Sequence, residues 1–337
     1  MDILIKSFNR PYYLDRCIQS IKTFVVCSEY RIVVLDDGTP HKYLDKLTWK
    51  YPDIVILKSS LYDQKANDIS NNSPNINSTI PKDLWLYGAK HASDYFVLLE
   101  DDYWFIDKID LNQLEMSLKQ EEVQILKLFW LGNPHLISEN IIKKCDSYSI
   151  YKPKLLVKNP LLYKLIFHTY KFRIHDIFTF FNIYTDKRAL HYYTIYAVAG
   201  AVFNKNYFLN VWGSTRISVD EGVQLSNAVK FIYKNRKAVF GFTGAEFLKT
   251  GFLSSATNQH KHYENVDIDM FAFNKIINEA WFNDGFDAMA HFPKDLDTKK
   301  IEAILNRENN AFAKKEEWQK WVAGFKKQYI SFGCHID

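Results

Sequence analysis

The chain has 337 residues, of which 47% are hydrophobic, 24% are charged and 16% are aromatic. This composition is typical of a folded globular protein, and it excludes a wholly disordered chain, a collagen and a disulfide-stapled mini-protein. The formal net charge of +4 is too small to indicate nucleic-acid binding, so we expect no nucleic-acid partner.

The N-terminus and the cysteines favour a cytoplasmic protein. Asp2 leads directly into a strand-like apolar run, whereas a signal peptide would carry no negative charge there. The longest uninterrupted apolar stretch, residues 195–203, is far shorter than the roughly 20 residues that cross a bilayer. The four cysteines form no CxxC pair, which argues against a zinc ribbon or a thioredoxin-like site and favours reduced thiols.

The first 110 residues alternate between strand and helix patterns. Apolar runs predict strands at residues 2–7, 31–35, 54–57 and 95–99. After Pro11, which suits the first turn of a helix, apolar residues recur at helical spacing. This alternation predicts an α/β fold with a mixed, mainly parallel central sheet flanked by helices, and ligands bind such sheets at the carboxyl ends of the strands.

The rest of the chain is less regular. Residues 63–79 are rich in Asn and Ser and predict a loop, which is either functional or a tolerated surface insertion. Further buried strands are predicted at 124–131 and 195–203. From about residue 265 onward the apolar spacing is helical, which predicts a helical C-terminal extension.

Residues 151–196 interleave Lys and Arg with Phe and Tyr, and Asp176 and Asp186 are the only acidic residues among them. One interpretation is a buried element that supplies core aromatics. A second is an interfacial segment, with basic residues at anionic headgroups and aromatic rings at the membrane boundary. A nucleic-acid surface is the third, and the acidic motifs elsewhere make it the least favoured.

Paired carboxylates follow the predicted strand 31–35. Asp36 and Asp37 stand in a strong turn with Gly38. A carboxylate there either caps the turn by accepting backbone N–H bonds or accepts the ring N–H of a uracil or guanine base. Both interpretations stay open for this motif taken alone.

Three adjacent carboxylates, Glu100, Asp101 and Asp102, follow the buried run 95–99. Anions crowded against a low-dielectric core repel one another unless a cation compensates. Mg²⁺ or Mn²⁺ is the simplest such cation, because both prefer oxygen ligands and keep positions open for a substrate diphosphate. The alternative is a solvated acidic turn.

These motifs, in this order, resemble the family-2-type glycosyltransferases with the Rossmann-like GT-A fold. The first strand leads into Ser7-Phe8-Asn9-Arg10-Pro11, and the second ends in Asp36-Asp37-Gly38-Thr39. The run 96–102 resembles the strand that enters the family's DxD motif, with Glu100 in place of the first Asp. The resemblance covers residues 1–105 well and residues 190–250 weakly.

The resemblance implies roles for individual residues. Asp37 would contact the base and Asp101 would lie near the ribose, while either Lys65 or Lys261 would meet the diphosphate. The full set expected to bind the nucleotide-sugar is Ser7, Phe8, Asn9, Arg10, Asp37, Lys65 and Asp101. The metal, Mn²⁺ or Mg²⁺, would be held by Asp102, with Glu100, His260 and His262 as further candidates.

The catalytic base is left open between two acids. In inverting members of the family a later carboxylate deprotonates the acceptor, and here Asp220 and Glu221 precede a helical pattern. Acids at a helix start are also ordinary N-terminal chemistry, so either residue would equally serve as a cap.

We therefore expect a metal-dependent glycosyltransferase of the hexosyltransferase type, acting with inversion in cell-surface polysaccharide or glycan synthesis. It would move a sugar from a UDP- or GDP-sugar to a glycan or lipid-linked acceptor. Residues 1–110 would bind the donor, 111–260 the acceptor, and 261–337 would form the extension. The protein would be cytoplasmic, and peripheral at the inner face of the membrane if 151–196 contacts lipid.

Two alternatives remain. One is a catalytically degenerate GT-A protein that binds sugar or acts as a scaffold. The other is a sugar nucleotidyltransferase, which would carry a Gly-rich N-terminal loop, and residues 3–20 contain no Gly.

Overall fold

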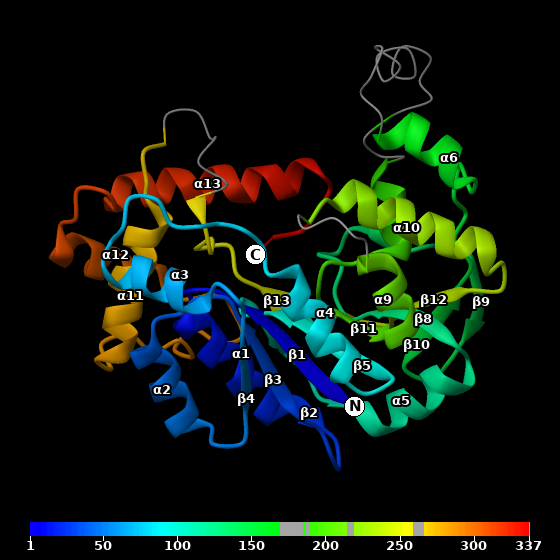
Figure 1. Ribbon diagram of the computed structural model, residues 1–337, viewed down its shortest axis with the longest axis horizontal. Coiled ribbons are helices and arrows are strands. Elements are labelled where there is room, and N and C mark those ends of the chain that lie inside the picture. Colours follow the sequence, from blue (N-terminus) through cyan, green and yellow to red (C-terminus); the bar gives the residue numbers. More distant parts are fainter. Residues whose placement is uncertain (169–184, 186–188, 214–218, 259–265, 337) are drawn as a thin grey trace.

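The computed structural model describes residues 1–168, 185, 189–213, 219–258 and 266–336 (Figure 1). Nine of the described strands form one central sheet. They are β1 (Asp2–Ser7), β3 (Ile32–Asp36), β4 (Val55–Lys58), β5 (Tyr95–Glu100), β8 (Val123–Lys127), β9 (Ile141–Lys144), β10 (Tyr148–Tyr151), β11 (Ala201–Asn204) and β12 (Val239–Thr243).

The sheet is mixed and mainly parallel, as predicted. Its order is β4-β3-β1-β5-β11-β8-β12-β10-β9. Only β11 and β10 run against the direction shared by the other described strands of this sheet. Two small sheets pair β2 (Val25–Val26) with β7 (Ile109–Asp110), and β6 (Tyr103–Phe105) with β13 (Leu248–Thr250).

Helices cover both faces of the sheet (Figure 1). The helices on one side include α1 (Pro11–Phe24), α2 (His41–Lys50), α11 (Met270–Phe282), α12 (Thr298–Glu308) and α13 (Lys315–Ser331). The other side carries α4 (Lys82–His91), α9 (Lys205–Trp212) and α10 (Glu221–Lys234). The remaining described helical segments are α3 (Tyr62–Ser70), α5 (Leu111–Gln120), α6 (Pro160–Tyr163), and the short η1 (Pro134–Leu136), η2 (Lys164–His168) and η4 (His191–Ile195).

Alternation along the central strands explains the two cores. Ile3 and Ile5 of β1 join the core on the α1 side, while Leu4 between them joins the core under α4 and α9. Successive side chains of a strand point to opposite faces, so a strand buried on both faces is apolar throughout. This is why the central residues of β1 and β5 were recognisable as apolar runs.

The structure corrects three of the predicted elements. Residues 62–70 form helix α3, so only the second half of the predicted 63–79 loop is irregular. The strand predicted at 195–203 begins at Ala201, because His191–Ile195 forms a 3₁₀ helix and Gly200 takes a left-handed φ of +70°. The strand predicted at 124–131 is Val123–Lys127.

The three C-terminal helices belong to the main core. Trp318, Trp321 and Phe325 of α13 are buried in the same cluster as Ile3 and Ile5 of β1. Among the described residues, none of the helices combines the length and the apolar character needed to cross a membrane.

Candidate active site

The site lies where β1, β3 and β5 end together. Their register sets Ser7 opposite Asp36 and Lys6 opposite Glu100. Parallel strands end at one edge of a sheet, so the motifs at residues 7–10, 36–39 and 100–102 meet there, as the sequence predicted.

Asp36 has a structural role in its turn. Its carboxylate accepts hydrogen bonds from Gly38 N at 3.0 Å, Thr39 N at 2.8 Å and Thr39 Oγ1 at 2.7 Å, and it is fully buried. Gly38 has a φ of +141°, and a Cβ there would lie 2.5 Å from the Cβ of Lys65. The turn therefore requires glycine, and it brings Asp37 against Lys65.

Asp37 and Lys65 form a buried ion pair. Lys65 Nζ donates to Asp37 Oδ2 at 2.5 Å and to the carbonyl of Thr79 at 2.6 Å. The same ammonium lies 5.4 Å from the centre of the Phe8 ring. Burial raises the pKa of Asp37, although Lys65 opposes the shift. The structure thus places Lys65 beside the expected base-binding carboxylate.

Arg10 joins the two aspartates of the third motif. One guanidinium nitrogen donates to Asp102 Oδ2 at 2.8 Å and the other donates to Asp101 Oδ1. Asp101 Oδ2 also accepts from Phe8 N at 3.3 Å. Burial raises the pKa of Asp101 to about 7 and that of Asp102 to about 6, although Arg10 opposes both shifts. Arg10 is therefore the counter-ion that these adjacent carboxylates require.

Glu100 is paired separately. Lys6 Nζ donates to Glu100 Oε1 at 2.7 Å and lies 4.4 Å from the centre of the Trp85 ring. Burial acts to raise the pKa of Glu100, but Lys6 more than offsets it and the net shift is downward. Asn9 is another residue predicted to bind the nucleotide-sugar, and it is fully buried. Its Oδ1 accepts a hydrogen bond from Asn278 Nδ2 at 3.1 Å, which connects the segment 7–10 to α11.

The strand-end carboxylates are candidate ligands of a divalent cation. Among the described residues no group of three His, Cys, Asp or Glu side chains could hold a metal by itself. Asp102 Oδ1, however, is buried and has no hydrogen-bond partner among these residues. Mg²⁺ commonly takes only one or two carboxylates and fills its remaining positions with substrate phosphates and water. Asp102 fits that arrangement, whereas Glu100 is occupied by Lys6.

Most of these side chains line a cavity of about 150 Å³, but Asn9, Asp36 and Asp102 are not part of its wall. The predicted residues in its wall are Ser7, Phe8, Arg10, Asp37, Lys65, Glu100 and Asp101. The wall also contains Lys6, Ser78, Ile80, Pro81, Trp85, Ala256 and Thr257, which the sequence analysis did not assign. A lysine inside the apolar run 2–7 was a signal for Lys6, and the Asn- and Ser-rich loop was a signal for Ser78. Nothing in the sequence indicated Ala256 or Thr257, because their approach depends on the path of the chain after β13.

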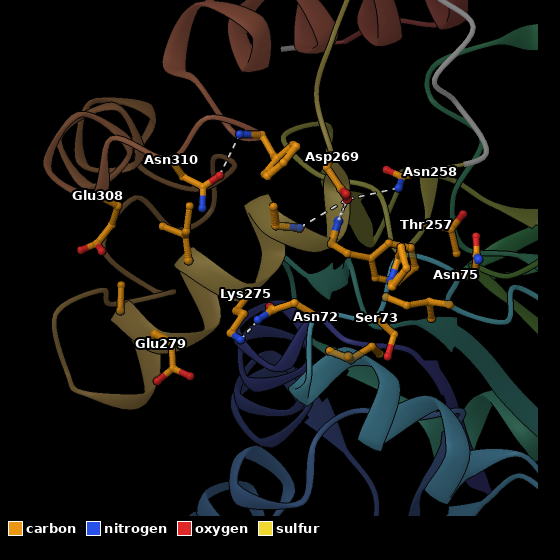
Figure 2. Close-up of a pocket in the computed structure, with 18 of the residues that line it drawn as sticks. Asn72, Ser73, Asn75, Thr257, Asn258, Asp269, Lys275, Glu279, Glu308 and Asn310 are labelled. Carbon is orange, nitrogen blue, oxygen red and sulfur yellow. Dashed lines mark hydrogen bonds between the residues drawn. The ribbon is translucent and has the colours of Figure 1, made fainter.

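A broader cleft of about 1460 Å³ adjoins this cavity, and Ser78 and Thr257 line both (Figure 2). Its walls include the loop after α3, helix α11, residues 257–258, and the end of α12 with the segment that follows it. Several of its charged groups are engaged within the protein: Lys275 Nζ donates to Asn72 Oδ1 at 2.7 Å, and Asp269 caps α11 and accepts from Asn258 at 3.1 Å. Many of the other polar groups in the wall are neutral amides and hydroxyls.

The two base candidates differ in their surroundings. Asp220 is the N-cap of α10, where its Oδ1 accepts from Val223 N at 3.2 Å. Glu221 is exposed, and its Oε2 accepts from Tyr193 Oη at 2.6 Å. Burial raises the pKa of Tyr329, and the negative charges of Glu100, Asp102 and Glu221 raise it further. Neither Asp220 nor Glu221 is part of the wall of the 150 Å³ cavity.

Several predictions fall outside the described residues. His260, Lys261 and His262 lie in the segment 259–265, so the role of the histidines as metal ligands and that of Lys261 at the diphosphate stay predictions. Of the basic and aromatic stretch 151–196, the structure describes 151–168, 185 and 189–196.

The comparisons with known proteins give structural similarity only. No family model matches the chain, and no curated protein matches it. S. aureus TarS 1–349 in complex with UDP-GlcNAc is 11% identical with a TM-score of 0.41, over 98% of this chain and 72% of that chain. The galactosyltransferase LgtC in complex with donor and acceptor sugar analogues is 12% identical with a TM-score of 0.36, over 74% of this chain and 86% of that one.

The bifunctional glycosyltransferase WbbM is 10% identical with a TM-score of 0.37, over 85% of this chain and 51% of that chain. Similarity at this level does not decide a family or an activity. The functional conclusion therefore depends on the geometry of the site.

Proposed function

We propose that this protein is a GT-A-type glycosyltransferase that uses a nucleotide-sugar donor and a hydroxyl acceptor. The observation that carries the proposal is the meeting of three motifs at one cavity, whose wall contains Phe8, the Asp37–Lys65 pair and the Arg10–Asp101 pair. Arg10 also pairs with Asp102, which is not itself part of that wall. Asp37 can accept a hydrogen bond from a nucleobase, and the flat ring of Phe8 can pack against that base. The carboxylates compensated by Arg10 lie at the carboxyl ends of the strands. Together these groups suit a nucleoside diphosphate.

In this proposal the donor's base lies against Phe8 and donates its ring N–H to Asp37. The Asp37–Lys65 pair is buried, so a base that supplied a donor there would gain a charge-assisted hydrogen bond in a low-dielectric site. Uracil and guanine carry such an N–H, which adenine and cytosine lack. The donor is therefore a UDP- or GDP-sugar.

Asp102 and the donor phosphates would hold Mn²⁺ or Mg²⁺, which would neutralise charge on the departing nucleoside diphosphate. Arg10 orients both aspartates of the cluster, and Asp101 is fixed further by the N–H of Phe8. His260 and His262 are further ligand candidates of the same proposal, and Glu100 would become one only by leaving its ion pair with Lys6.

The acceptor would be a hydroxyl of a glycan or of a lipid-linked glycan, as in cell-surface polysaccharide synthesis. Glu221 is the base candidate of this proposal, because Asp220 is engaged in capping α10 while Glu221 is exposed. A single displacement by the deprotonated hydroxyl would invert the anomeric configuration.

Nucleotide binding tests the proposal directly. Calorimetry of the full chain with UDP, GDP, ADP and CDP in the presence of Mn²⁺ should show binding of UDP or GDP in preference to the other two. Asp37→Ala should remove that preference, while the exposed control Asp94→Ala should retain it. The proposal fails if none of the four binds or if Asp37→Ala leaves the preference intact.

Turnover assays with other substrates distinguish the two alternatives from this proposal. A sugar nucleotidyltransferase would bind UTP or GTP productively and release pyrophosphate with a sugar 1-phosphate. A degenerate sugar-binding or scaffold protein would bind a donor and never turn it over.

A further inference from the structure

Exposed leucines and lysines lie on α6, in the segment before it and at the start of η2. We call this surface the Leu–Lys face and define it by Leu156, Leu161, Leu162, Leu165, Lys152, Lys154 and Lys158, all of which are exposed. Leu161 retains 78% and Leu162 retains 52% of its accessible surface. Helix α6 stands at the edge of the molecule, beyond α10 (Figure 1).

The fold does not need these leucines. The inner side of α6 is anchored by Tyr163, which is buried and lies 4.6 Å from Tyr192 between ring centres. Tyr192 Oη in turn accepts from Val157 N at 2.9 Å. With the inward side already occupied by aromatic packing, leucines on the outward side add apolar surface that no described part of the chain covers.

The charged residues of the segment that carries these leucines are basic. No acidic residue occurs between Asp146 and Asp176 in the sequence. Among the described residues, Lys152, Lys154 and Lys158 form no ion pair with any carboxylate. The Leu–Lys face therefore combines exposed leucines with exposed lysines and contains no acidic residue.

We propose that the Leu–Lys face binds an anionic lipid surface. Leucines that enter the acyl boundary and lysines that reach the headgroups supply the two signals that stable peripheral binding requires. A second copy of the chain is a poorer occupant, because association would bring two sets of unpaired lysines together. This inference goes beyond glycosyl transfer and does not depend on it.

Vesicle flotation of the full chain tests the inference. The probes are vesicles of equal parts phosphatidylglycerol and phosphatidylcholine, and vesicles of phosphatidylcholine alone. We expect binding to the anionic vesicles, weakened by added salt, and little binding to the neutral ones. The double variant Leu161→Gln/Leu162→Gln and the triple variant Lys152→Gln/Lys154→Gln/Lys158→Gln should each lower the partition coefficient by about tenfold or more.

Matched controls separate this face from a general effect of charge or apolarity. Lys299→Gln/Lys300→Gln/Lys327→Gln removes the same charge from exposed positions of α12 and α13, and Met116→Gln/Ile330→Gln removes exposed apolar surface elsewhere. Both controls should float like the wild type, and all variants should keep its melting temperature.

Three outcomes would overturn the inference. The first is no flotation of the wild type with anionic vesicles at low salt, and the second is an equal loss of flotation in the controls. The third is self-association of the wild type, measured by light scattering, that Leu161→Gln/Leu162→Gln abolishes without changing lipid binding. None of these bears on donor binding, so a failure here leaves the proposed function to its own test.

Discussion

At the scale of single residues, Arg10 stabilises the candidate site in the unliganded protein. It is almost completely buried and contacts both Asp101 and Asp102. Arg10→Ala would leave two buried carboxylates without a counter-ion, and we expect a loss of about 3–5 kcal/mol in the free energy of unfolding by urea.

A surface pair provides the control for that prediction. Arg307→Ala removes the exposed partner of Glu308 and should cost only about 0–1 kcal/mol. The deficit of Arg10→Ala should also shrink as the pH is lowered, since protonation removes the uncompensated charges. Equal losses for the two variants would show that Arg10 is not a buried counter-ion.

The two aspartates should also make stability depend on pH. Burial raises the pKa of Asp101 to about 7 and of Asp102 to about 6, against about 3.9 in an unfolded chain. The native state therefore binds protons more tightly, and this contribution is complete below about pH 4 and is lost as the pH rises towards 7.

The measurement is the urea midpoint of the metal-free protein from about pH 4 to 7.5. The wild type should lose stability over this range relative to Asp101→Asn/Asp102→Asn, in which the titration is absent. Parallel curves for the two proteins would contradict the raised pKa values.

Residue-level reasoning from the sequence succeeded where a side chain's role is set by its own strand. The acidic strand ends at Asp37, Asp101 and Asp102 were recognisable, because these carboxylates follow apolar runs that are visible in the local sequence. The pairing of Arg10 with Asp101 and Asp102 was not, since it joins positions about ninety residues apart. Lys65 was a candidate for the diphosphate, whereas the structure places it on Asp37, and that contact depends on how α3 packs.

At the scale of elements, the start of α10 carries two adjacent acids with different expected roles: Asp220 caps the helix, and Glu221 is the proposed general base. Asp220→Asn keeps an N-cap acceptor, so we expect stability and activity to stay near those of the wild type. Glu221→Gln removes a general base and should lower kcat by about 10²–10⁴-fold with little change in melting temperature, because Glu221 is exposed.

The readouts are the rate of donor turnover and the melting temperature of each variant. If Asp220→Asn loses turnover while Glu221→Gln keeps it, the two roles are reversed. Unchanged turnover in both variants would remove the carboxylate base from the proposed mechanism.

Strands and helices could be predicted where the spacing of apolar residues within the segment itself determines the structure. The strands β1, β3, β4 and β5 and the C-terminal helices follow from apolar spacing alone. The edge strands β9 and β10 did not stand out, because Ile141–Lys144 is exposed and owes its strand conformation to pairing with Tyr148–Tyr151. Helix α3 was hidden by the Asn- and Ser-rich composition of its second half.

At the scale of the whole molecule, the C-terminal helices share the central core. Trp318 is 2% exposed, lies 5.9 Å from Phe273 between ring centres and donates its Nε1–H to the carbonyl of Leu253 at 2.9 Å. Trp318→Ala should therefore lower the free energy of unfolding by about 3–5 kcal/mol in a single cooperative transition.

Trp49 is the matched control, because it is 86% exposed and Trp49→Ala should change stability by no more than about 0.5 kcal/mol. Equilibrium unfolding followed by circular dichroism decides between these values. A separate low-temperature transition for the C-terminal helices in Trp318→Ala would contradict the shared core.

The central claim is that this sheet edge binds and activates a nucleotide-sugar through Asp102. Its most direct test is turnover of a panel of UDP- and GDP-sugars with Mn²⁺ by the wild type, Asp102→Ala and the exposed control Asp94→Ala. We predict metal-dependent release of UDP or GDP by the wild type and Asp94→Ala, and a loss of about 10²-fold or more in Asp102→Ala. Full activity and full metal response in Asp102→Ala would contradict the account.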